Sequence, residues 1–474
     1  MLKENEIYII DDGHQATIFD IVGINLYNVT HTGAEIIKDF FFKKKDIKKI
    51  AQEHKIEKEK IMGFISKIEE IIEEKRRNLR PSGYAPNAIS RLNINVSHKC
   101  NFACKYCYAN HGTYGGSASI MSIHTAIQTV KFFCEKFDRI DSVVFFGGEP
   151  LLNMPAIEII IKNFHSFCKS RRMRLPQFAV LTNGSIYTEK IATVLDKYNV
   201  ALSISIDGPS QIHDKIRRYK KNGRGTLKTI LSNIERYKKF SNIALWYEAT
   251  YTPFHKRKKM DRAQTKYFIE NNTGIKKGTI SDAFLPQKHI DEMKYYCFTL
   301  DEIFSDFKYI GKIVESSLNN ILKGKSFNWD IGKMISYFVE RQPSHLFCTA
   351  GLQTYIVTPD GNIYPCQFFI DERFKLGSVF EGFNEGKLAE FSFFINKATN
   401  PKCKDCWLRF VCETCMGQFY QMTGEFAIPE MYCKFKKKLW EIFLMKINKI
   451  FSDANKREKF ISNFNRLSKG GIAK

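Results

Sequence analysis

The strongest constraint on the fold is an alternation of apolar strands and amphipathic helices that begins at residue 91. Short runs rich in β-branched and aromatic residues predict five strands, at 91–97, 142–150, 177–184, 200–209 and 242–251. Segments with apolar residues at helical spacing fall between them, at 121–137, 155–170, 188–199 and 226–240. Strands that alternate with helices in this way form parallel β/α sheets. Because no GxGxxG turn is present, the pattern favours a barrel-like form over a dinucleotide-binding fold.

The polar motifs of this region follow the strands directly. A cysteine loop follows the first strand, GGEP ends the second, LTNG ends the third and SIDGP ends the fourth. In a parallel barrel, the C-terminal ends of the strands meet at one face, where barrel enzymes build their active sites. We therefore expect these motifs to form one site.

The rest of the chain divides into segments of different character. Residues 1–80 carry short β-rich runs followed by helical patterns, which predicts a separate small domain. A β-hairpin is predicted around Asp360-Gly361, a strong two-residue turn signal. The predicted divisions are a small domain (1–80), a linker (81–90), the barrel (91–300), a bridging helical region (301–345), a cysteine-rich domain (346–440) and a basic helix with a tail that packs on the protein (441–474).

Charge and cysteine usage bear on partners and compartment. The formal net charge is +23, which suits an acidic partner of several classes and discriminates weakly among them. Neither a signal peptide nor a membrane span is evident, so we expect a cytoplasmic protein without membrane contact. In a reducing cytosol, clustered cysteines indicate metal sites or catalysis more often than disulfides. Ten of the thirteen cysteines are clustered, whereas Cys134, Cys168 and Cys297 stand alone and are predicted as buried small hydrophobes.

The loop after the first strand contains Cys100, Cys104 and Cys107 in the pattern C-x3-C-x2-C. Thiolates are soft ligands that select zinc or iron–sulfur clusters. A structural zinc site needs a fourth ligand, which His98 or His111 would supply. Alternatively, three cysteines hold three irons of a cubane and leave the fourth iron open to a small molecule.

The loop, with Tyr106 before its last cysteine, and the motifs after it resemble the signature of radical S-adenosylmethionine (SAM) enzymes. The resemblance implies a partial (β/α)6, TIM-like barrel, and a [4Fe–4S] cluster on the three cysteines whose open iron binds SAM. In such enzymes, reductive cleavage of SAM yields a 5′-deoxyadenosyl radical. The residues that the resemblance assigns to SAM are Tyr106, Gly147, Gly148, Glu149, Asn183, Ser205, Asp207 and Arg217. Within that set, Glu149 would hold the SAM ammonium group and Arg217 its carboxylate, although turn chemistry or helix capping would also explain these residue types.

A second set of seven cysteines lies in the C-terminal third of the chain, at 348, 366, 403, 406, 412, 415 and 433. A zinc ribbon on Cys403, Cys406, Cys412 and Cys415 is the simple alternative, but it leaves three cysteines unexplained. The full set resembles the SPASM domain, the iron–sulfur extension of radical SAM peptide and protein maturases.

The SPASM resemblance implies two auxiliary [4Fe–4S] clusters, and hence three clusters in the chain. One would take Cys403, Cys406, Cys412 and Cys433, and the other Cys348, Cys366 and Cys415. Cys412 and Cys415 in "CETC" are separated by two residues, whereas the family usually has three there. The eighth cysteine that fully ligated members carry shortly before the hairpin is absent. We therefore expect an open iron at the second cluster, which a substrate thiolate would occupy, with Cys297 an improbable remote ligand.

Residues 1–80 resemble the small winged-helix-like, PqqD-like domain with which peptide-modifying enzymes recognise precursor peptides. Such a domain would bind an extended leader peptide as an added strand. The alternative is a domain that only stabilises the barrel.

Taken together, the resemblances imply a radical SAM maturase of a ribosomally made precursor peptide, forming an intrapeptide crosslink, with a cysteine thioether as the expected bond. A flavodoxin or ferredoxin with its reductase would supply electrons. The alternatives are an anaerobic sulfatase-maturing enzyme, which forms formylglycine, a radical SAM enzyme that modifies RNA, and a non-enzymatic iron–sulfur or zinc scaffold. The dispersed basic residues, without an aromatic platform for single strands, argue against nucleic acid. No catalytic base is identifiable from spacing.

Overall fold

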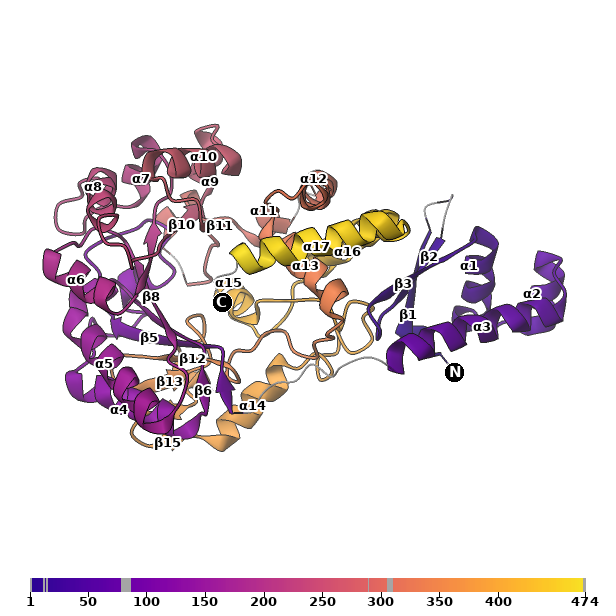
Figure 1. The fold of residues 1–474 in the computed structure, drawn as a ribbon, viewed down its shortest axis with the longest axis horizontal. Coiled ribbons are helices and arrows are strands. Elements are labelled where there is room, and N and C mark those ends of the chain that lie inside the picture. The colour runs from indigo at the N-terminus through magenta and orange to yellow at the C-terminus, as the bar shows by residue number, and fades with distance from the viewer. Residues whose placement is uncertain are drawn as a thin grey trace.

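The computed structural model describes residues 2–11, 13, 16–77, 87–288, 290–304 and 310–471. It consists of an N-terminal α/β domain, a barrel and a C-terminal region whose long helices lie between the other two (Figure 1). No helix in these described ranges is both long and apolar enough to cross a bilayer.

The barrel contains six parallel strands, which confirms the predicted fold class. The sheet order β11-β10-β9-β8-β7-β5 places the five predicted strands side by side, with β11 as a sixth. The strands are β5 (Arg91–Ser97), β7 (Ser142–Gly147), β8 (Gln177–Thr182), β9 (Ala201–Ser205), β10 (Leu245–Tyr251) and β11 (Gly278–Asp282). The helices that follow them are α4 (Ile123–Lys136), α5 (Met154–Arg171), α6 (Glu189–Lys197), α7 (Ser210–Ile216), α8 (Leu227–Tyr237), α9 (Pro253–Arg257) and α10 (Arg262–Thr273). Short 3₁₀ turns lie at Asn110–Gly112, Pro150–Asn153 and Asp291–Tyr295, and a two-stranded ladder joins β4 (Ala88–Ile89) to β6 (Arg139–Ile140).

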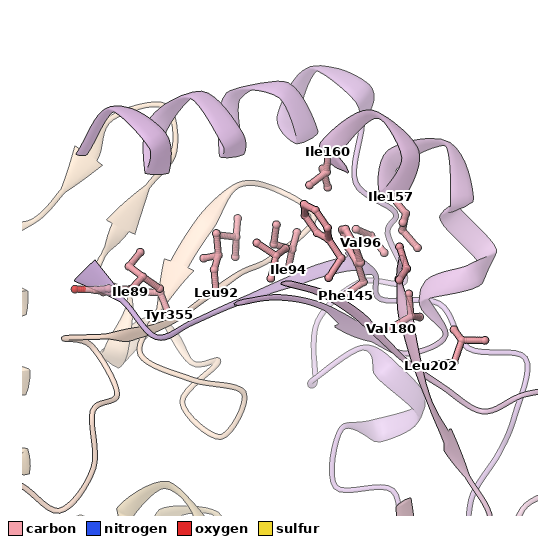
Figure 2. Packing of buried hydrophobic residues seen from close by; sticks show 14 of the residues in the cluster. Ile89, Leu92, Ile94, Val96, Phe145, Ile157, Ile160, Val180, Leu202 and Tyr355 are labelled. Atoms are coloured by element: carbon pink, nitrogen blue, oxygen red, sulfur yellow. The ribbon is translucent and has the colours of Figure 1, made fainter. Parts of the chain in front are cut away.

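The outer face of the sheet forms the main core of the protein. Ile157 and Ile160 of α5 lie over Phe145 and Val180 of the strands (Figure 2). These side chains are buried, and the apolar residues of α4, α5, α6 and α8 recur at the spacing that places them on one helix face. This packing holds the C-terminal strand ends in register.

The sheet continues beyond the barrel into the cysteine-rich region. β12 (Thr354–Val357) pairs in parallel with β5, and it forms the predicted hairpin with β13 (Asn362–Tyr364). The sheet ends with β14 (Gly377–Ser378) and β15 (Gly382–Phe383), and Gly361 has the positive φ of 88° that the hairpin turn requires. The remaining elements are α14 (Glu385–Ile395), α15 (Met416–Thr423) and a 3₁₀ turn at Glu372–Phe374.

Long helices link the barrel, the cysteine-rich region and the N-terminal domain. They are α11 (Leu300–Phe304), α12 (Ile310–Leu322), α13 (Trp329–Glu340), α16 (Glu430–Phe451) and α17 (Ala454–Gly471). α16 packs on α12 through a buried core that includes Trp440 and Phe443, as expected for a tail that packs on the protein. The predicted divisions at 300/301 and 440/441 fall inside α11 and α16, respectively.

The N-terminal domain is an antiparallel sheet with three helices. Its elements are a 3₁₀ turn (Glu4–Glu6), β1 (Ile7–Asp11), β2 (Ala16–Asp20), β3 (Asn25–Val29), α1 (His31–Ile37), a π-helix (Lys38–Phe42), α2 (Ile47–His54) and α3 (Lys58–Arg77). Alternation along β2 directs Ile18 toward the helices and Phe19 toward α13 and α16, so both faces of the sheet are covered. Of the predicted linker, residues 81–86 lie outside the described residues, and Ala88–Ile89 form β4.

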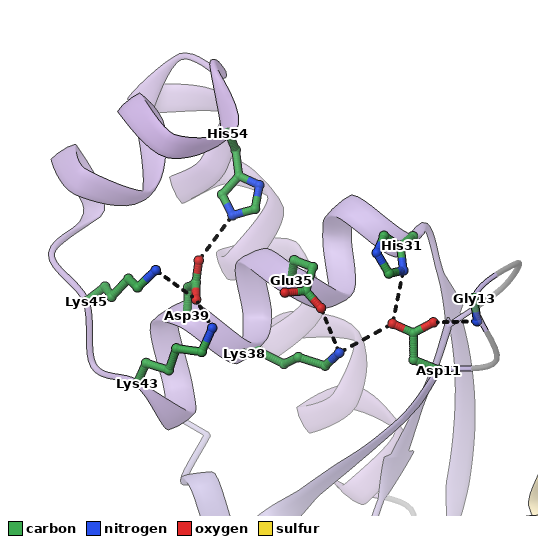
Figure 3. Close-up of polar contacts among 9 residues, drawn as sticks. All are labelled: Asp11, Gly13, His31, Glu35, Lys38, Asp39, Lys43, Lys45 and His54. Carbon is green, nitrogen blue, oxygen red and sulfur yellow. Dashed lines mark hydrogen bonds and ion pairs between the residues drawn. The ribbon is translucent and has the colours of Figure 1, made fainter.

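Two polar clusters hold the N-terminal helices together (Figure 3). Asp39 is buried and accepts hydrogen bonds from Lys43, Lys45 and His54, which ties the π-helix to α2. Burial alone would raise the pKa of Asp39, but these partners outweigh it and lower that pKa to about 2.

The second cluster joins Asp11, His31 and Glu35, whose ligand atoms lie within 4.8 Å of one another. The Lys38 ammonium group lies 3.3 Å from Asp11 and 2.7 Å from Glu35 (Figure 3). The Lys38 ammonium group therefore already neutralises the negative charge that these carboxylates would otherwise offer to a metal cation.

Candidate functional site

The three-cysteine loop leaves β5 at Ser97 and crosses the C-terminal face of the barrel. Cys100, Cys104 and Cys107 are all partly buried. The backbone N–H of Phe102 donates to Cys100 Sγ at 3.4 Å, and the N–H of His111 donates to Cys107 Sγ at 3.2 Å. Amide donors aimed at sulfur are a common feature of iron–sulfur sites, because they stabilise negative charge on the cluster.

The two glycines of the GGEP motif allow the cysteine loop to lie against β7. A Cβ on Gly147 would lie 2.2 Å from the Ser97 carbonyl oxygen, and one on Gly148 would lie 2.4 Å from that of Lys99. The Gly148 and Glu149 amides donate to these same two carbonyls, at 2.8 and 2.9 Å. Any side chain at either glycine would push the loop off the strand end.

The Glu149 carboxylate is fully buried and is held by three protein donors. Its Oε1 accepts from the Leu151 amide and the Thr182 hydroxyl, and its Oε2 accepts from the Asn183 amide at 2.7 Å. Burial raises the pKa of this carboxyl group, and the three hydrogen bonds act in the opposite direction. Glu149 therefore fixes the end of β7 to the end of β8. Its contact with the SAM ammonium group remains a prediction.

Asn183 and Ser205 stand at the ends of the next two strands. The Asn183 side-chain amide donates to Asn101 Oδ1 at 2.7 Å, and its Nδ2 lies 3.9 Å from Cys100 Sγ. This bond joins the end of β8 to the cysteine loop. Ser205 is the last residue of β9 and is partly buried beside β10, where its register partner is Glu248.

Tyr106, Asp207 and Arg217 form a buried network under the loop. The Tyr106 hydroxyl donates to Asp207 Oδ2 at 2.7 Å and accepts from the Arg217 guanidinium at 2.5 Å. Arg217 also lies 3.9 Å from Asp207, and Asp207 Oδ1 accepts from the Thr250 amide at 2.9 Å. Arg217 Nε is buried with no acceptor among the described residues. A buried N–H without an acceptor is costly, so this donor calls for an acidic ligand group.

These residues fit a SAM-bound iron–sulfur cluster. Burial raises the pKa of all three cysteine thiols, to about 11 for Cys100, and the Arg217 charge acts against that rise at each. A cluster supplies the positive metal centres that turn such thiols into thiolates. The free Arg217 donor would meet a carboxylate with the geometry that arginine favours.

Zinc would bring the ligand atoms closer together than they lie in this structure. A tetrahedral ion with Zn–S bonds of about 2.3 Å brings its sulfurs to roughly 3.8 Å from one another. Across the described ranges, which include every cysteine, no cysteine belongs to a group of three ligand atoms within 4.8 Å. A cubane spreads its sulfurs farther apart, because each sulfur binds a different iron. Neither His98 nor His111 joins such a group, and burial lowers the pKa of His98 to about 4.

Four of the C-terminal cysteines surround one cavity of about 170 Å³. They are Cys403, Cys406, Cys412 and Cys433, the set expected for one auxiliary cluster. The Leu408 amide donates to Cys406 Sγ at 3.5 Å, which repeats the amide-to-sulfur pattern of the first loop. We call this the distal site.

The other three C-terminal cysteines influence one another electrostatically. Burial first, and then the charges of Cys415 and Cys348, raise the pKa of the Cys366 thiol well above its ordinary value. Cys415, which precedes α15, is exposed to solvent. We call Cys348, Cys366 and Cys415 the proximal site. Of the two cysteines in "CETC", Cys412 lines the distal cavity, whereas Cys415 is an electrostatic partner of Cys366 and Cys348.

Tyr108 connects the first loop with the proximal site, because it follows Cys107 directly and its ring contacts Phe368, two residues after Cys366. After burial, the charges of both Cys107 and Cys366 contribute to raising the pKa of Tyr108. Its ring packs on Phe284 and Phe368, at centroid distances of 5.7 and 5.1 Å. The sequence analysis did not single out Tyr108, because an aromatic residue beside a cysteine motif has no distinctive spacing.

Cys297 lies beside the first loop. It is 1% exposed, packs with Ala283 and Met293, and has a pKa raised to about 12 by burial and then by the charge of Cys107. None of the proximal cysteines is among its electrostatic partners. This placement agrees with the expectation that Cys297 is an improbable auxiliary ligand.

One charged residue inside the barrel was also missed from the sequence. Glu248 of β10 is exposed to solvent, yet the surrounding protein desolvates its carboxyl group and raises the pKa of that group. The charge of Arg91, a hydrogen bond to Ser203 and the charge of Arg217 act in the opposite direction. A carboxylate that reaches solvent while protein desolvates it lies in a concavity, so Glu248 faces the barrel interior. A charged residue within the apolar run of β10 was the signal that could have revealed it.

Two segments of the chain, which carry the two parts of the site, each match a known family model. Residues 94–263 match the family model described as "Radical SAM superfamily", and residues 348–407 match the one described as "Iron-sulfur cluster-binding domain", SPASM. The chain therefore has a radical SAM domain followed by a SPASM domain, and its fold is the α/β fold of radical SAM proteins.

Several curated relatives are modifying or maturing enzymes. The radical SAM cyclopropyl synthase TigE of Paramaledivibacter caminithermalis is 31% identical over 32% of this chain and 34% of its own length. A cysteine-type anaerobic sulfatase-maturating enzyme of Clostridium perfringens is 24% identical over 73% of this chain and 94% of its own. The antilisterial bacteriocin subtilosin biosynthesis protein AlbA of Bacillus subtilis is 23% identical over 60% of this chain and 56% of its own. The chain thus spans about a third of the TigE relative and just over half of AlbA.

A solved structure has the same fold. The structure described as "Native anSMEcpe with bound AdoMet" superposes with a TM-score of 0.60 at 20% identity, covering 80% of this chain and 99% of that one. A fifth of this chain therefore has no counterpart in that structure.

Proposed function

We propose that the chain is a radical SAM maturase that abstracts a hydrogen atom from a ribosomally made precursor peptide and closes an intrapeptide cysteine thioether. The observation that carries this proposal is the ring contact of Tyr108, the residue after Cys107, with Phe368, two residues after Cys366 in the proximal site. A reaction that starts at one site and captures a thiol at the other needs both to be next to the same substrate.

The cluster on the first loop, with SAM bound, would supply the 5′-deoxyadenosyl radical. Cys100, Cys104 and Cys107 would hold that cluster, Arg217 the SAM carboxylate, and Gly147 and Gly148 the backbone edge beside it. The proximal site, with three cysteines and exposed Cys415, supports an iron left open for a substrate thiolate. With the distal site, the chain would carry three [4Fe–4S] clusters.

Glu248 is our candidate for the proton acceptor. Forming a thioether transfers one hydrogen atom from carbon to the deoxyadenosyl radical and releases the proton of the thiol, while one electron leaves the substrate for an iron–sulfur acceptor. A carboxylate with a raised pKa inside the barrel is suited to take that proton. Glu248→Gln should slow crosslinking and remove the acidic limb of its pH profile, with deoxyadenosine formation retained and Glu248→Asp restoring part of the rate.

The N-terminal domain would recognise the leader of the precursor. β3 is an edge strand whose only ladder partner among the described residues is β2, so it can accept an added strand. An acidic leader would suit the net charge of +23.

The decisive experiment combines the anaerobically reconstituted enzyme with SAM, dithionite and a cysteine-bearing peptide encoded beside its gene. We expect 5′-deoxyadenosine and a peptide lighter by two hydrogens, with no free thiol at the crosslinked cysteine. Cys104→Ala should abolish both products. A formylglycine product on a sulfatase peptide would instead establish the sulfatase-maturing alternative, which the breadth of that alignment favours.

Hydrogen exchange tests leader recognition separately. Binding of full-length precursor should slow exchange of the β3 amides, residues 25–29, and leave the amides of α4 unchanged. Core peptide without leader is the control and should protect neither. Unchanged exchange in β3 at saturating precursor would contradict strand addition.

A further inference from the structure

Lys397 is a buried lysine at the distal site. It is 2% exposed, which is unusual because lysine is almost never fully buried without a charged partner. Its ammonium group donates to the Ser344 carbonyl oxygen at 3.0 Å, and within the described ranges no carboxylate lies within ion-pair distance of it. Within the described residues, the protein therefore buries this cation without a carboxylate at ion-pair distance.

The charges that oppose this cost are mainly those of cysteine thiols, with a smaller contribution from Glu413. Burial lowers the pKa of Lys397 to about 8, and the charges of Cys412 and Cys403 are the largest influences that act against the lowering. Lys397 lines the same cavity of about 170 Å³ as the four distal cysteines. An isolated ammonium group is expensive to bury, so a negative partner in this cavity would balance it.

Other cations around the cavity are more open to water. Lys402 and Lys437 line it but are exposed, and Arg409 and Lys436 are partly exposed. Water screens these charges, whereas the charge of Lys397 acts through protein of low dielectric. Lys397 is thus the cation with the strongest expected effect on anything bound between the cysteines.

We propose that Lys397 is the internal counter-ion of the iron–sulfur cluster held by Cys403, Cys406, Cys412 and Cys433. A cluster on four thiolates is anionic, and one-electron reduction adds a further negative charge. The nearby ammonium group stabilises the reduced form more than the oxidised form and so raises the reduction potential, which depends on local charge. The electron comes from an external donor, and Lys397 keeps its proton throughout. The inference rests on the distal cluster of the proposed function.

The test is a redox titration of the reconstituted full-length enzyme, followed by electron paramagnetic resonance. Cys433→Ala identifies the distal signal as the one that it removes. Lys397→Met keeps the length of the side chain and removes the charge. At a fixed solution potential, we expect it to lower the reduced-to-oxidised ratio of the distal signal about tenfold, a shift of about 59 mV for one electron.

Two further variants separate charge from packing. Lys397→Arg keeps the charge and should stay within about twofold of wild type, and the exposed control Lys402→Met should shift the ratio less than Lys397→Met does. If the Met variant loses the distal iron while the Arg variant retains it, the counter-ion role is also supported. Equal shifts in both variants, equal loss of iron, or no shift in the Met variant would overturn it. If Cys433→Ala removes no signal and no iron, the distal cluster itself is absent, and the proposed cluster count fails together with this inference.

Discussion

The buried pair of Arg217 and Asp207 yields the sharpest quantitative prediction. Asp207 is fully buried, and its carboxylate is 3.9 Å from Arg217, with Tyr106 hydrogen-bonded to both. Arg217→Met leaves a buried carboxylate without its cation, which costs roughly 3–5 kcal/mol of unfolding free energy. Asp207→Asn leaves the guanidinium unpaired and should also destabilise strongly.

The double variant distinguishes pairing from packing. Removing both charges should recover about 2–3 kcal/mol relative to the sum of the two single losses, because neither charge is then left alone. Anaerobic urea unfolding measures each free energy. The matched control is Arg218→Met, since Arg218 Nε bonds only a backbone carbonyl, that of Asp214, and should cost less than about 1 kcal/mol. Additive losses in the double variant would refute the pairing.

The double variant should regain part of its unfolding free energy but not its affinity for SAM. The unpartnered Arg217 Nε is the proposed donor to the SAM carboxylate, and a charged hydrogen bond contributes roughly 1.5–3 kcal/mol. Both Arg217→Met and the double variant should therefore bind SAM about tenfold to a hundredfold more weakly in equilibrium dialysis. Wild-type affinity in the double variant would show that Arg217 does not contact SAM.

Three other predictions concern single side chains. Cys297→Ala should leave the iron content unchanged, because Cys297 packs away from the proximal cysteines; loss of one cluster would contradict this. Cys412→Ala and Cys415→Ala should each lose one cluster's iron but remove different resonance signals, whereas a zinc ribbon would bind zinc in place of iron. Asp39→Asn should lower stability by about 1–2 kcal/mol at neutral pH, since the Asp39 pKa falls from 3.8 unfolded to about 2 folded. That stabilisation is complete above pH 3.8 and disappears as pH falls through about 2, so the variant should show a flatter acid unfolding curve there.

The sequence predicted the barrel well, because its signals are local. Periodicity within each segment identifies a strand or helix, and the order of segments determines the parallel sheet. The motifs meet for the same reason, since all follow strand ends. Glu149 shows the limit of this reasoning. Its type and place suited a ligand to an ammonium group, but the structure adds three protein donors that no spacing rule reveals.

Features that depend on distant segments could not be predicted. The pairing of β12 with β5 joins residues more than 250 positions apart, and no periodicity within either strand identifies the other. The predicted divisions at 300/301 and 440/441 fall within helices α11 and α16, and in α16 the buried residues Leu439, Trp440 and Phe443 lie on both sides of the second. Lys397 stands in a polar stretch of the sequence, and only the packing around the distal site reveals its burial.

The N-terminal domain is not simply a detachable module. Phe19 of its sheet shares a buried core with Trp440 and Phe443 of α16, and Tyr8 stacks on Trp407 at 4.0 Å, between Cys406 and the rest of the distal loop. Removing residues 1–80 would therefore expose apolar surface beside the distal site as well as remove β3. Loss of leader binding in such a truncation would not separate recognition from damage to an iron–sulfur site. Through the same contacts, a leader peptide bound at β3 would affect the distal site, because the other face of the sheet packs against α16 and Tyr8 stacks on Trp407.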